Sequence, residues 1–160
     1  KLAERKTTSI LMNNLYDHNY EPYHFAVMPL TERLSVGEQF TGRGVRIAFL
    51  DSGFYPRDDI KNRIVAFHDV SGEEDALENL KQPQPHHRHG TQTTVIEAGD
   101  GTLCSGTYRG IAGQSELILI EVSENGQITE HHIARGLESV LENHQKFQIR
   151  ILNISLGENE

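Results

Sequence analysis

The chain has 160 residues, 36% of them hydrophobic, which is enough for one domain with its own core and short for two. Its 15 Lys and Arg against 23 Asp and Glu give a formal net charge of −8, and an acidic chain without a basic cluster is a poor candidate for binding nucleic acid or an anionic membrane. No apolar run approaches the roughly 18 residues of a membrane span, and the single cysteine, Cys104, excludes an internal disulfide and lies in a stretch that predicts a surface loop.

Residues 1–40 carry the weakest pattern in the chain. Apolar residues between positions 10 and 15 indicate a short helical stripe, and prolines further on would interrupt a longer one. We expect either a lead-in segment that packs against the following domain or the end of a pro-segment. The sequence begins with Lys1 instead of methionine, so we expect its N-terminus to be processed or cut off.

The strongest strand signal lies in residues 45–53, V-R-I-A-F-L-D-S-G. Five apolar residues within six positions predict a strand buried on both faces of a parallel sheet. An unpaired carboxylate inside such a strand would cost several kcal/mol, so Asp51 is expected at the carboxyl end, where α/β sheets bind ligands. The alternative is that Asp51 only begins a turn, because Asp, Ser and Gly are common turn residues.

A second strand is predicted over residues 63–70, after a turn in which Asp59 is expected to be solvated. Residues 71–85, acidic and then rich in Gln and Pro, predict an exposed loop. This loop leads to His86, His87 and His89, and clustered imidazoles are common zinc ligands. Adjacent histidines, however, are expected to point in different directions. The other adjacent pair, His131 and His132, falls in the first turn of a helix, so we predict no metal site.

The motif His89-Gly90-Thr91 opens a stretch of small residues, a pattern that can place an imidazole at the N-terminus of a helix. A histidine there is a usable general base near neutral pH. The β-branched residues between positions 91 and 96 favour a strand by intrinsic propensity. The residues by themselves leave helix and strand open.

The rest of the chain predicts a strand, a helix and a further strand, over residues 116–122, 129–146 and 149–155. Thr129 is expected to cap the helix. The apolar stripe of this helix consists of Ile133, Leu137, Val140 and Leu141. A right-handed crossover of this kind, in a chain where strands alternate with helices and turns, predicts a parallel α/β sheet.

Four motifs, in their order and spacing, resemble the subtilisin-like serine peptidases, the peptidase S8 family. They are D-S-G at Asp51, H-G-T at His89, Y-R-G-I-A at Tyr108 and L-N-I-S-L-G ending at Gly157. Asp before His is also the order known for the triad of subtilisin. The resemblance covers residues 41–157 and implies a three-layer α/β fold with a parallel sheet, incomplete because the carboxy-terminal half is absent. It makes residues 41–160 the amino-terminal half of a peptidase domain and implies a helix at His89.

The resemblance further implies a serine-type endopeptidase that hydrolyses peptide bonds through an Asp-His-Ser triad. Asp51 would accept a hydrogen bond from His89, and His89 would take the proton from the attacking serine. Ser155, Leu156 and Gly157 resemble the family's substrate strand, beside which a polypeptide binds as an extra strand.

The sequence departs from the family pattern in two ways. Arg88 and Gln92 stand where the family commonly has a glycine and a second histidine, which loosens the match without removing a catalytic group. The family's nucleophilic serine and oxyanion asparagine follow the S-L-G strand, beyond Glu160, so Asn153 and Ser155 do not take these roles. We therefore expect a fragment of a longer enzyme, inactive by itself.

The resemblance implies no required cofactor. Members of the family often bind calcium near the loop that contains Asp59, but a calcium site needs about six to eight oxygen ligands, and we can assign no others from the sequence. Besides a polypeptide substrate, a pro-segment or an inhibitor is an implied partner. Because the family is mostly secreted, the resemblance implies an extracellular location.

Two other hypotheses stay open. One is a non-catalytic α/β module that binds a phosphate or nucleotide, although no glycine-rich phosphate motif follows a strand in this sequence. The other is a metal-dependent hydrolase that uses Asp51 and His89. A stoichiometric zinc or manganese ion bound by His89 would favour that reading.

Overall fold

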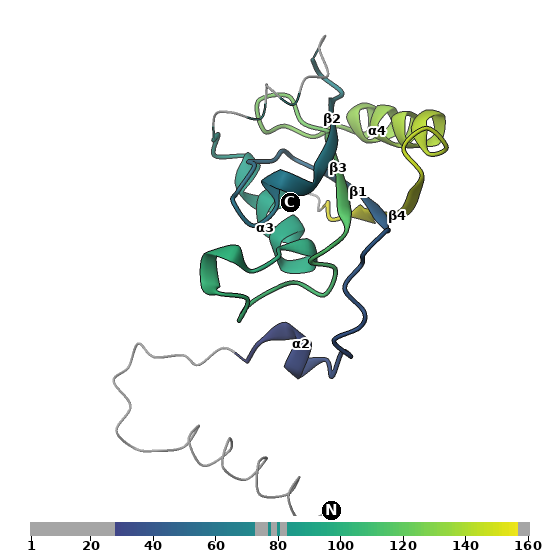
Figure 1. Cartoon of the computed structure of the whole chain (residues 1–160). Coiled ribbons are helices and arrows are strands. Elements are labelled where there is room, and N and C mark those ends of the chain that lie inside the picture. The colour runs from purple at the N-terminus through teal and green to yellow at the C-terminus, as the bar shows by residue number, and fades with distance from the viewer. Residues whose placement is uncertain (1–27, 73–76, 78–79, 81–82, 157–160) are drawn as a thin grey trace, which may run out of the picture.

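The computed structural model describes residues 28–72, 77, 80 and 83–156. A parallel four-stranded sheet, in the order β2-β3-β1-β4, forms the centre of the molecule (Figure 1). The strands are β1 Arg46–Asp51, β2 Ile64–Asp69, β3 Glu116–Glu121 and β4 Ile149–Ile154. The helices are α2 Leu30–Arg33, α3 His87–Ala98 and α4 Glu130–Asn143, with short 3-10 turns η1 Lys61–Arg63 and η3 Thr102–Cys104. The predicted strands and the crossover helix are confirmed, while the stripe predicted between residues 10 and 15 lies outside the described residues.

The two faces of the sheet carry separate apolar clusters because side chains alternate along each strand. Ile47 and Phe49 of β1 belong to the cluster that includes Ala98 of α3. Ala48 and Leu50 belong to the cluster that includes residues of α4. The sheet therefore lies between a layer that contains α3 and a layer that contains α4, which is the three-layer α/β arrangement that the family resemblance implied.

The α3 segment is helical although its sequence is rich in β-branched residues. Thr91 donates its hydroxyl hydrogen to the carbonyl oxygen of His87 (2.6 Å), and Thr94 donates to that of Gly90 (2.7 Å). These bonds to the preceding turn satisfy the buried hydroxyls within the helix itself. Packing of Ala98 and Val95 against the sheet then stabilises the helix against its low propensity.

The α4 helix packs through a narrower face than its sequence predicts. Leu137 and Val140 contact the core, but Leu141 is 70% exposed, so its assignment to the apolar stripe was wrong. Gly136 permits the close approach, because a Cβ there would lie 2.6 Å from Cγ1 of Val122 and 2.8 Å from Cδ1 of Leu50. The smallest residue therefore takes the position nearest the sheet.

Two predictions of exposure were also wrong. Asp59, expected in a solvated turn, is only 6% exposed. Leu80, in the loop expected to be exposed throughout, is 3% exposed and belongs to the α3-side cluster. An apolar side chain within a polar loop anchors that loop to the core, because its burial is favourable wherever the core can accept it.

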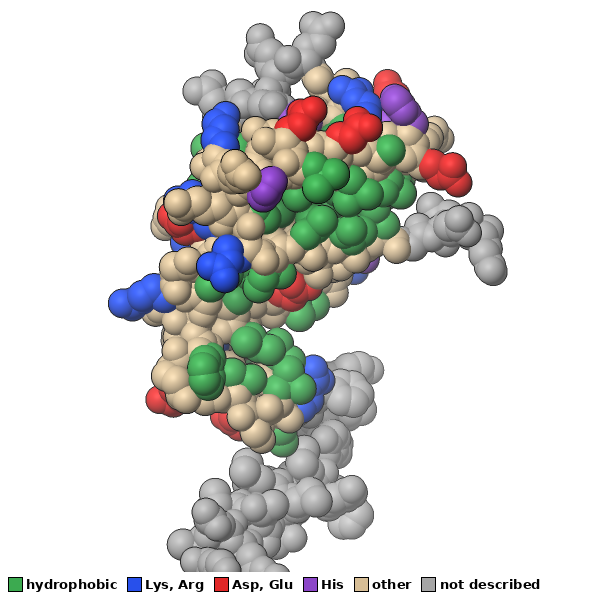
Figure 2. Space-filling model, turned by 90° about the vertical axis from the view of Figure 1, so that its right-hand side faces the viewer, with side chains coloured by type: hydrophobic (Ala, Val, Ile, Leu, Met, Phe, Trp, Pro, Cys, Tyr) green, Lys and Arg blue, Asp and Glu red, His purple; other side chains and the backbone are tan. Residues whose placement is uncertain are grey.

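Strand β4 lies at an edge of the sheet and pairs with β1. Its residues Ile151 and Ile154 are 50% and 49% exposed, and hydrophobic side chains gather on the side of the molecule that Figure 2 shows.

None of the helices that the structure describes is long and apolar enough to cross a lipid bilayer.

The cap of α4 gives a first test of this fold. Thr129 accepts a hydrogen bond from the backbone N–H of His132 at 3.2 Å, so Thr129→Ala should lower the free energy of unfolding by about 1 kcal/mol. Urea unfolding followed by circular dichroism measures this loss. Thr107→Ala, in an exposed loop, is the control and should change it by less than about 0.5 kcal/mol. Equal losses in the two variants would contradict the capping role.

Candidate active site

Three acidic residues meet at the carboxyl edge of the sheet. Asp51 ends β1 and lies opposite Glu121 of β3, which lies opposite Asp69 of β2. Asp51 is 1% exposed and Glu121 is 7% exposed. Buried carboxylates require compensating donors or cations, so the neighbours of each one indicate what this edge of the sheet does.

Asp51 is paired with a histidine. His89 lies in the first turn of α3, and its Nδ1 is 2.9 Å from Oδ1 of Asp51. Because a carboxylate can only accept, Nδ1 carries the hydrogen, and Nε2 of the neutral ring is left to accept a proton. The side chain of His89 is 60% exposed, whereas that of Asp51 is 1% exposed. The predicted contact is therefore present, with the imidazole open to solvent.

Two further residues hold the Asp51 carboxylate, and the sequence analysis missed both. Ser52 donates its backbone N–H to Oδ1 at 2.7 Å, and its hydroxyl lies 3.2 Å from Oδ1 and 2.9 Å from the carbonyl oxygen of His86, so its hydrogen is shared between two acceptors. The hydroxyl of Thr93 lies 3.2 Å from Oδ2 and 3.0 Å from the carbonyl oxygen of Gly90, so its hydrogen is shared between two acceptors. A signal was available for Thr93, because residues four apart on a helix share a face and Thr93 lies four positions after His89.

Gly90 explains how α3 comes so close to β1. A Cβ at this position would overlap the carbonyl oxygen of Gly53 and would lie 2.9 Å from Cβ of Asp51. Any side chain would therefore push the helix away from the strand. The glycine of the H-G-T motif thus sets the distance at which the carboxylate and the imidazole can meet.

A cavity of about 500 Å³ lies beside this pair. Asp51 and His89 line it together with Ser155 and Leu156, which follow β4. The cleft predicted from the sequence is present for these four residues, whereas Gly157 lies outside the described residues. The hydroxyl of Ser155 donates to Oδ1 of Asn153 at 2.8 Å.

A hydrogen bond connects α3 to β4, and residues at the start of α3 and after the end of β4 line the cavity. Nδ2 of Asn153 donates to Oε1 of Glu97 at 2.6 Å. Burial raises the pKa of Glu97 above its ordinary value. Asn153, which the sequence placed inside the last strand without a role, therefore orients β4 against the helix that carries His89.

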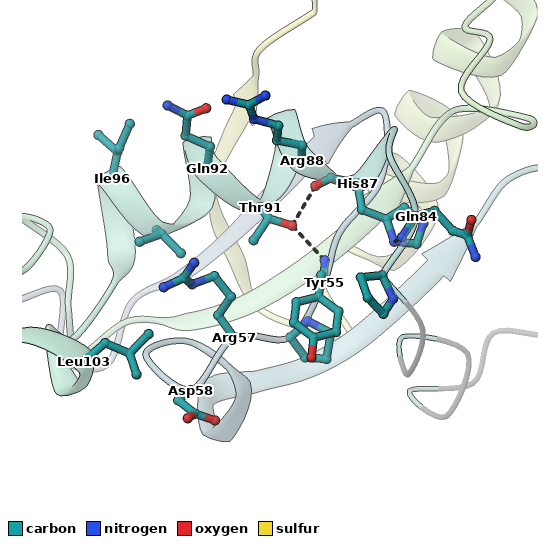
Figure 3. Close-up of a pocket in the computed structure, with 13 residues that line it drawn as sticks. Tyr55, Arg57, Asp58, Gln84, His87, Arg88, Thr91, Gln92, Ile96 and Leu103 are labelled. Carbon is teal, nitrogen blue, oxygen red and sulfur yellow. Dashed lines mark hydrogen bonds between the residues drawn. The ribbon is translucent and has the colours of Figure 1, made fainter.

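A larger cavity of about 720 Å³ lies along α3 (Figure 3). Thr91 stands at its wall, accepting the backbone N–H of Tyr55 at 2.8 Å while donating to His87. This bond fastens the loop after β1 to α3, and so braces the segment that follows Asp51. Arg88 and Gln92 line both this cavity and the one beside Asp51.

Glu121 faces two histidines. Its Oε1 is 3.4 Å from Nε2 of His86 and 3.7 Å from Nε2 of His87. Burial, with the neighbouring Asp69, raises the pKa of Glu121 to about 8, and burial lowers the pKa of His87. The two imidazoles, expected from the sequence to point apart, converge on one carboxylate.

The surroundings of Asp59 do not fit calcium. Its Oδ1 is buried without a hydrogen-bond partner, but Nε of Arg57 lies 3.6 Å away. Arg63 donates to its backbone carbonyl at 2.7 Å. Calcium requires several oxygen ligands, and two guanidinium groups in these positions oppose a cation.

Comparisons with known proteins agree with this geometry. Residues 42–160 match the model of a family described as the subtilase family. Serine protease AprX of Bacillus subtilis (strain 168) is 33% identical over 125 residues, which make up 76% of this chain and 27% of that protein.

Solved structures show the same fold. The Clostridium perfringens CspB protease gives a TM-score of 0.59 at 22% identity, over 80% of this chain and 32% of that one. The S41 psychrophilic protease gives 0.60 at 23% identity, over 75% and 39%. The chain therefore spans between 27% and 39% of the length of these relatives.

The close approach at Gly90 can be tested by adding one methyl group. Gly90→Ala should lower the free energy of unfolding by roughly 1–3 kcal/mol, because the new Cβ overlaps the backbone at Gly53. Urea unfolding provides the measurement. Gln92→Ala, exposed on the same helix, should change the value by less than about 0.5 kcal/mol. Unchanged stability of the Gly90 variant would refute the steric account.

Proposed function

The chain belongs to the subtilase family, and we propose that it supplies the Asp and His of an Asp-His-Ser triad to a serine-type endopeptidase. The observation that carries this proposal is the hydrogen bond of 2.9 Å between His89 Nδ1 and Asp51 Oδ1. It leaves Nε2 as the basic atom on an imidazole that faces a cavity.

In the proposed reaction, Nε2 of His89 takes the hydroxyl proton of a serine as its oxygen attacks the carbonyl carbon of a peptide bond. Asp51 stabilises the imidazolium that forms and keeps the ring in the required tautomer. The imidazolium then gives its proton to the amine as the C–N bond breaks. Water, deprotonated by the same imidazole, releases the acyl group from the serine.

The proposed serine is one supplied by further residues. Ser52 and Ser155 line the cavity, but their hydroxyls are engaged with the backbone oxygen of His86 and with Asn153. Neither is bonded to His89 in the described hydrogen-bond pattern. We therefore propose that residues 1–160 alone hydrolyse no peptide bond, since loss of the nucleophile costs on the order of 10⁶-fold in turnover.

The proposed substrate is a polypeptide that binds in an extended conformation beside Ser155 and Leu156, with Gly157 continuing the same segment. Support comes from the position of the first two residues, which line the cavity shared with His89. An extended peptide beside such a segment gains main-chain hydrogen bonds. A pro-segment or inhibitor would bind in the same manner, and an extracellular location is proposed from the family alone.

The catalytic roles predict large and unequal losses of activity. In a protein that contains this chain and a downstream serine, Asp51→Asn and His89→Ala should reduce kcat for a peptide substrate by on the order of 10⁴-fold and 10⁶-fold. Asp100→Asn and His131→Ala, both exposed, are the matched controls and should keep kcat within about twofold of the parent value. Full activity of either test variant would refute the proposal.

Labelling with a serine-directed phosphonate tests the base independently of any substrate. The longer protein should be labelled on one serine, because His89 would activate that hydroxyl. The His89→Ala variant should react slowly, and residues 1–160 alone should take up no label. Mass spectrometry of the labelled protein locates the modified residue, and uptake on Ser52 or Ser155 would contradict the proposed origin of the nucleophile.

A further inference from the structure

The group formed by His86, His87 and Glu121 lies beside the candidate triad residues but takes no part in the proposed reaction. One possible ligand atom of each of these three residues lies within 4.8 Å of the others. The two imidazole rings are nearly perpendicular, with centroids 4.4 Å apart and an interplanar angle of 83°. Two nitrogen donors and one carboxylate therefore converge from different directions on a single small space.

The separations within this group fit a shared ion better than direct hydrogen bonds. Oε1 of Glu121 is 3.4 Å from Nε2 of His86 and 3.7 Å from Nε2 of His87. Hydrogen bonds between nitrogen and oxygen are about 2.7–3.2 Å long. Ligand atoms of a tetrahedral zinc site with bonds of about 2.0 Å lie about 3.3 Å apart. The two separations from Glu121 are within about 0.5 Å of that value, while the ligand atoms of the whole group lie within 4.8 Å of one another, so the side chains would draw together around the ion.

The surrounding backbone leaves room for the three side chains. A Cβ at Gly53 would lie 2.6 Å from Cδ2 of His87 and 3.0 Å from Oε1 of Glu121. A Cβ at Gly126 would lie 2.9 Å from Cβ of His86. Both glycines have positive φ, +146° and +84°, which an L side chain rarely adopts. Two separate loops thus lack side chains where the group would otherwise be crowded.

Burial makes the charged form of the Glu121 carboxylate energetically costly unless a positive group lies beside it. The side chains of Glu121 and His87 are 9% and 10% exposed, and that of His86 is 22% exposed. Asp51 is satisfied by Ser52, Thr93 and His89, as described above. Glu121 has the two imidazoles instead, and the adjacent Asp69 adds negative charge to the same edge. A divalent cation would compensate the Glu121 carboxylate.

We propose that His86, His87 and Glu121 form a binding site for Zn²⁺, separate from the Asp51–His89 pair. Two imidazoles and a carboxylate are a donor set that zinc accepts, with water in the fourth position. His86 lines the cavity beside Asp51, which gives the ion a route from solvent. The metal would join the end of β3 to the first residue of α3, and thereby restrain the turn that carries His89.

One contact must change when the ion binds. The backbone N–H of Gln84 donates to Nδ1 of His87 at 3.2 Å, which places the hydrogen of the neutral ring on Nε2. Coordination through Nε2 moves that hydrogen to Nδ1, so the bond from Gln84 is lost and Nδ1 becomes a donor. Gln84 is exposed and its N–H can bond to water instead. Zinc should therefore increase hydrogen exchange at the Gln84 amide.

The experiment measures zinc directly on the longer protein, freed of metal by a chelator and then dialysed against micromolar zinc. We expect one zinc ion per chain by elemental analysis, and a higher thermal midpoint that the chelator reverses. Glu121→Gln and His86→Asn should each weaken zinc binding by roughly 10- to 100-fold or more, measured by competition with a chromophoric indicator. If the buried Glu121 variant misfolds, the His86 variant decides alone.

Matched variants exclude other sites. His131→Ala removes an exposed histidine and should leave the affinity for zinc unchanged, and His89→Ala should do the same. Absence of bound zinc in the parent protein would overturn the proposal. It would equally be overturned if His86→Asn bound zinc as tightly as the parent, or if His89→Ala lost the ion. The last result would favour a metal held by the Asp51–His89 pair, independently of whether peptide bonds are cleaved.

Discussion

The buried carboxylate of Asp51 is the constraint on which the candidate site depends. It ends the central strand β1 at 1% exposure, where water cannot stabilise its charge. Ser52, Thr93 and His89 supply the donors instead, from the following turn and from one face of α3. The requirement to satisfy one charge thus fixes the position of the helix, and the position of the helix fixes the exposed imidazole.

Glycine makes that arrangement sterically feasible. Gly90 brings α3 into contact with the backbone at Gly53, and Gly136 brings α4 close to Leu50 on the opposite face. Both helices are therefore tightly packed on the strand that carries Asp51. Threonine hydroxyls bonded to preceding carbonyl groups, as in Thr94, keep α3 regular at this short distance. The helix can then hold His89 within hydrogen-bond reach of Asp51, as a positioned general base requires.

The same edge of the sheet carries two charge arrangements with different chemistry. Asp51 is matched by hydrogen-bond donors and one exposed imidazole, which suits proton transfer. Glu121, one strand away, is matched by two largely buried imidazoles at distances longer than hydrogen bonds, which suits a cation. The group of His86, His87 and Glu121 includes the first residue of α3. A cation bound there would therefore also restrain His89, two residues further along the helix.

The sequence by itself determined the strands, the crossover helix and the position of Asp51, because each depends on local periodicity or on the cost of burying a charge. The meeting of Asp51 with His89 followed from the resemblance, as did the helical state of α3, which local propensity opposed. Tertiary structure alone decided the burial of Asp59 and the convergence of His86 and His87 on Glu121. These features bring together residues on separate segments, and no pattern within one segment reports which side chains will face each other.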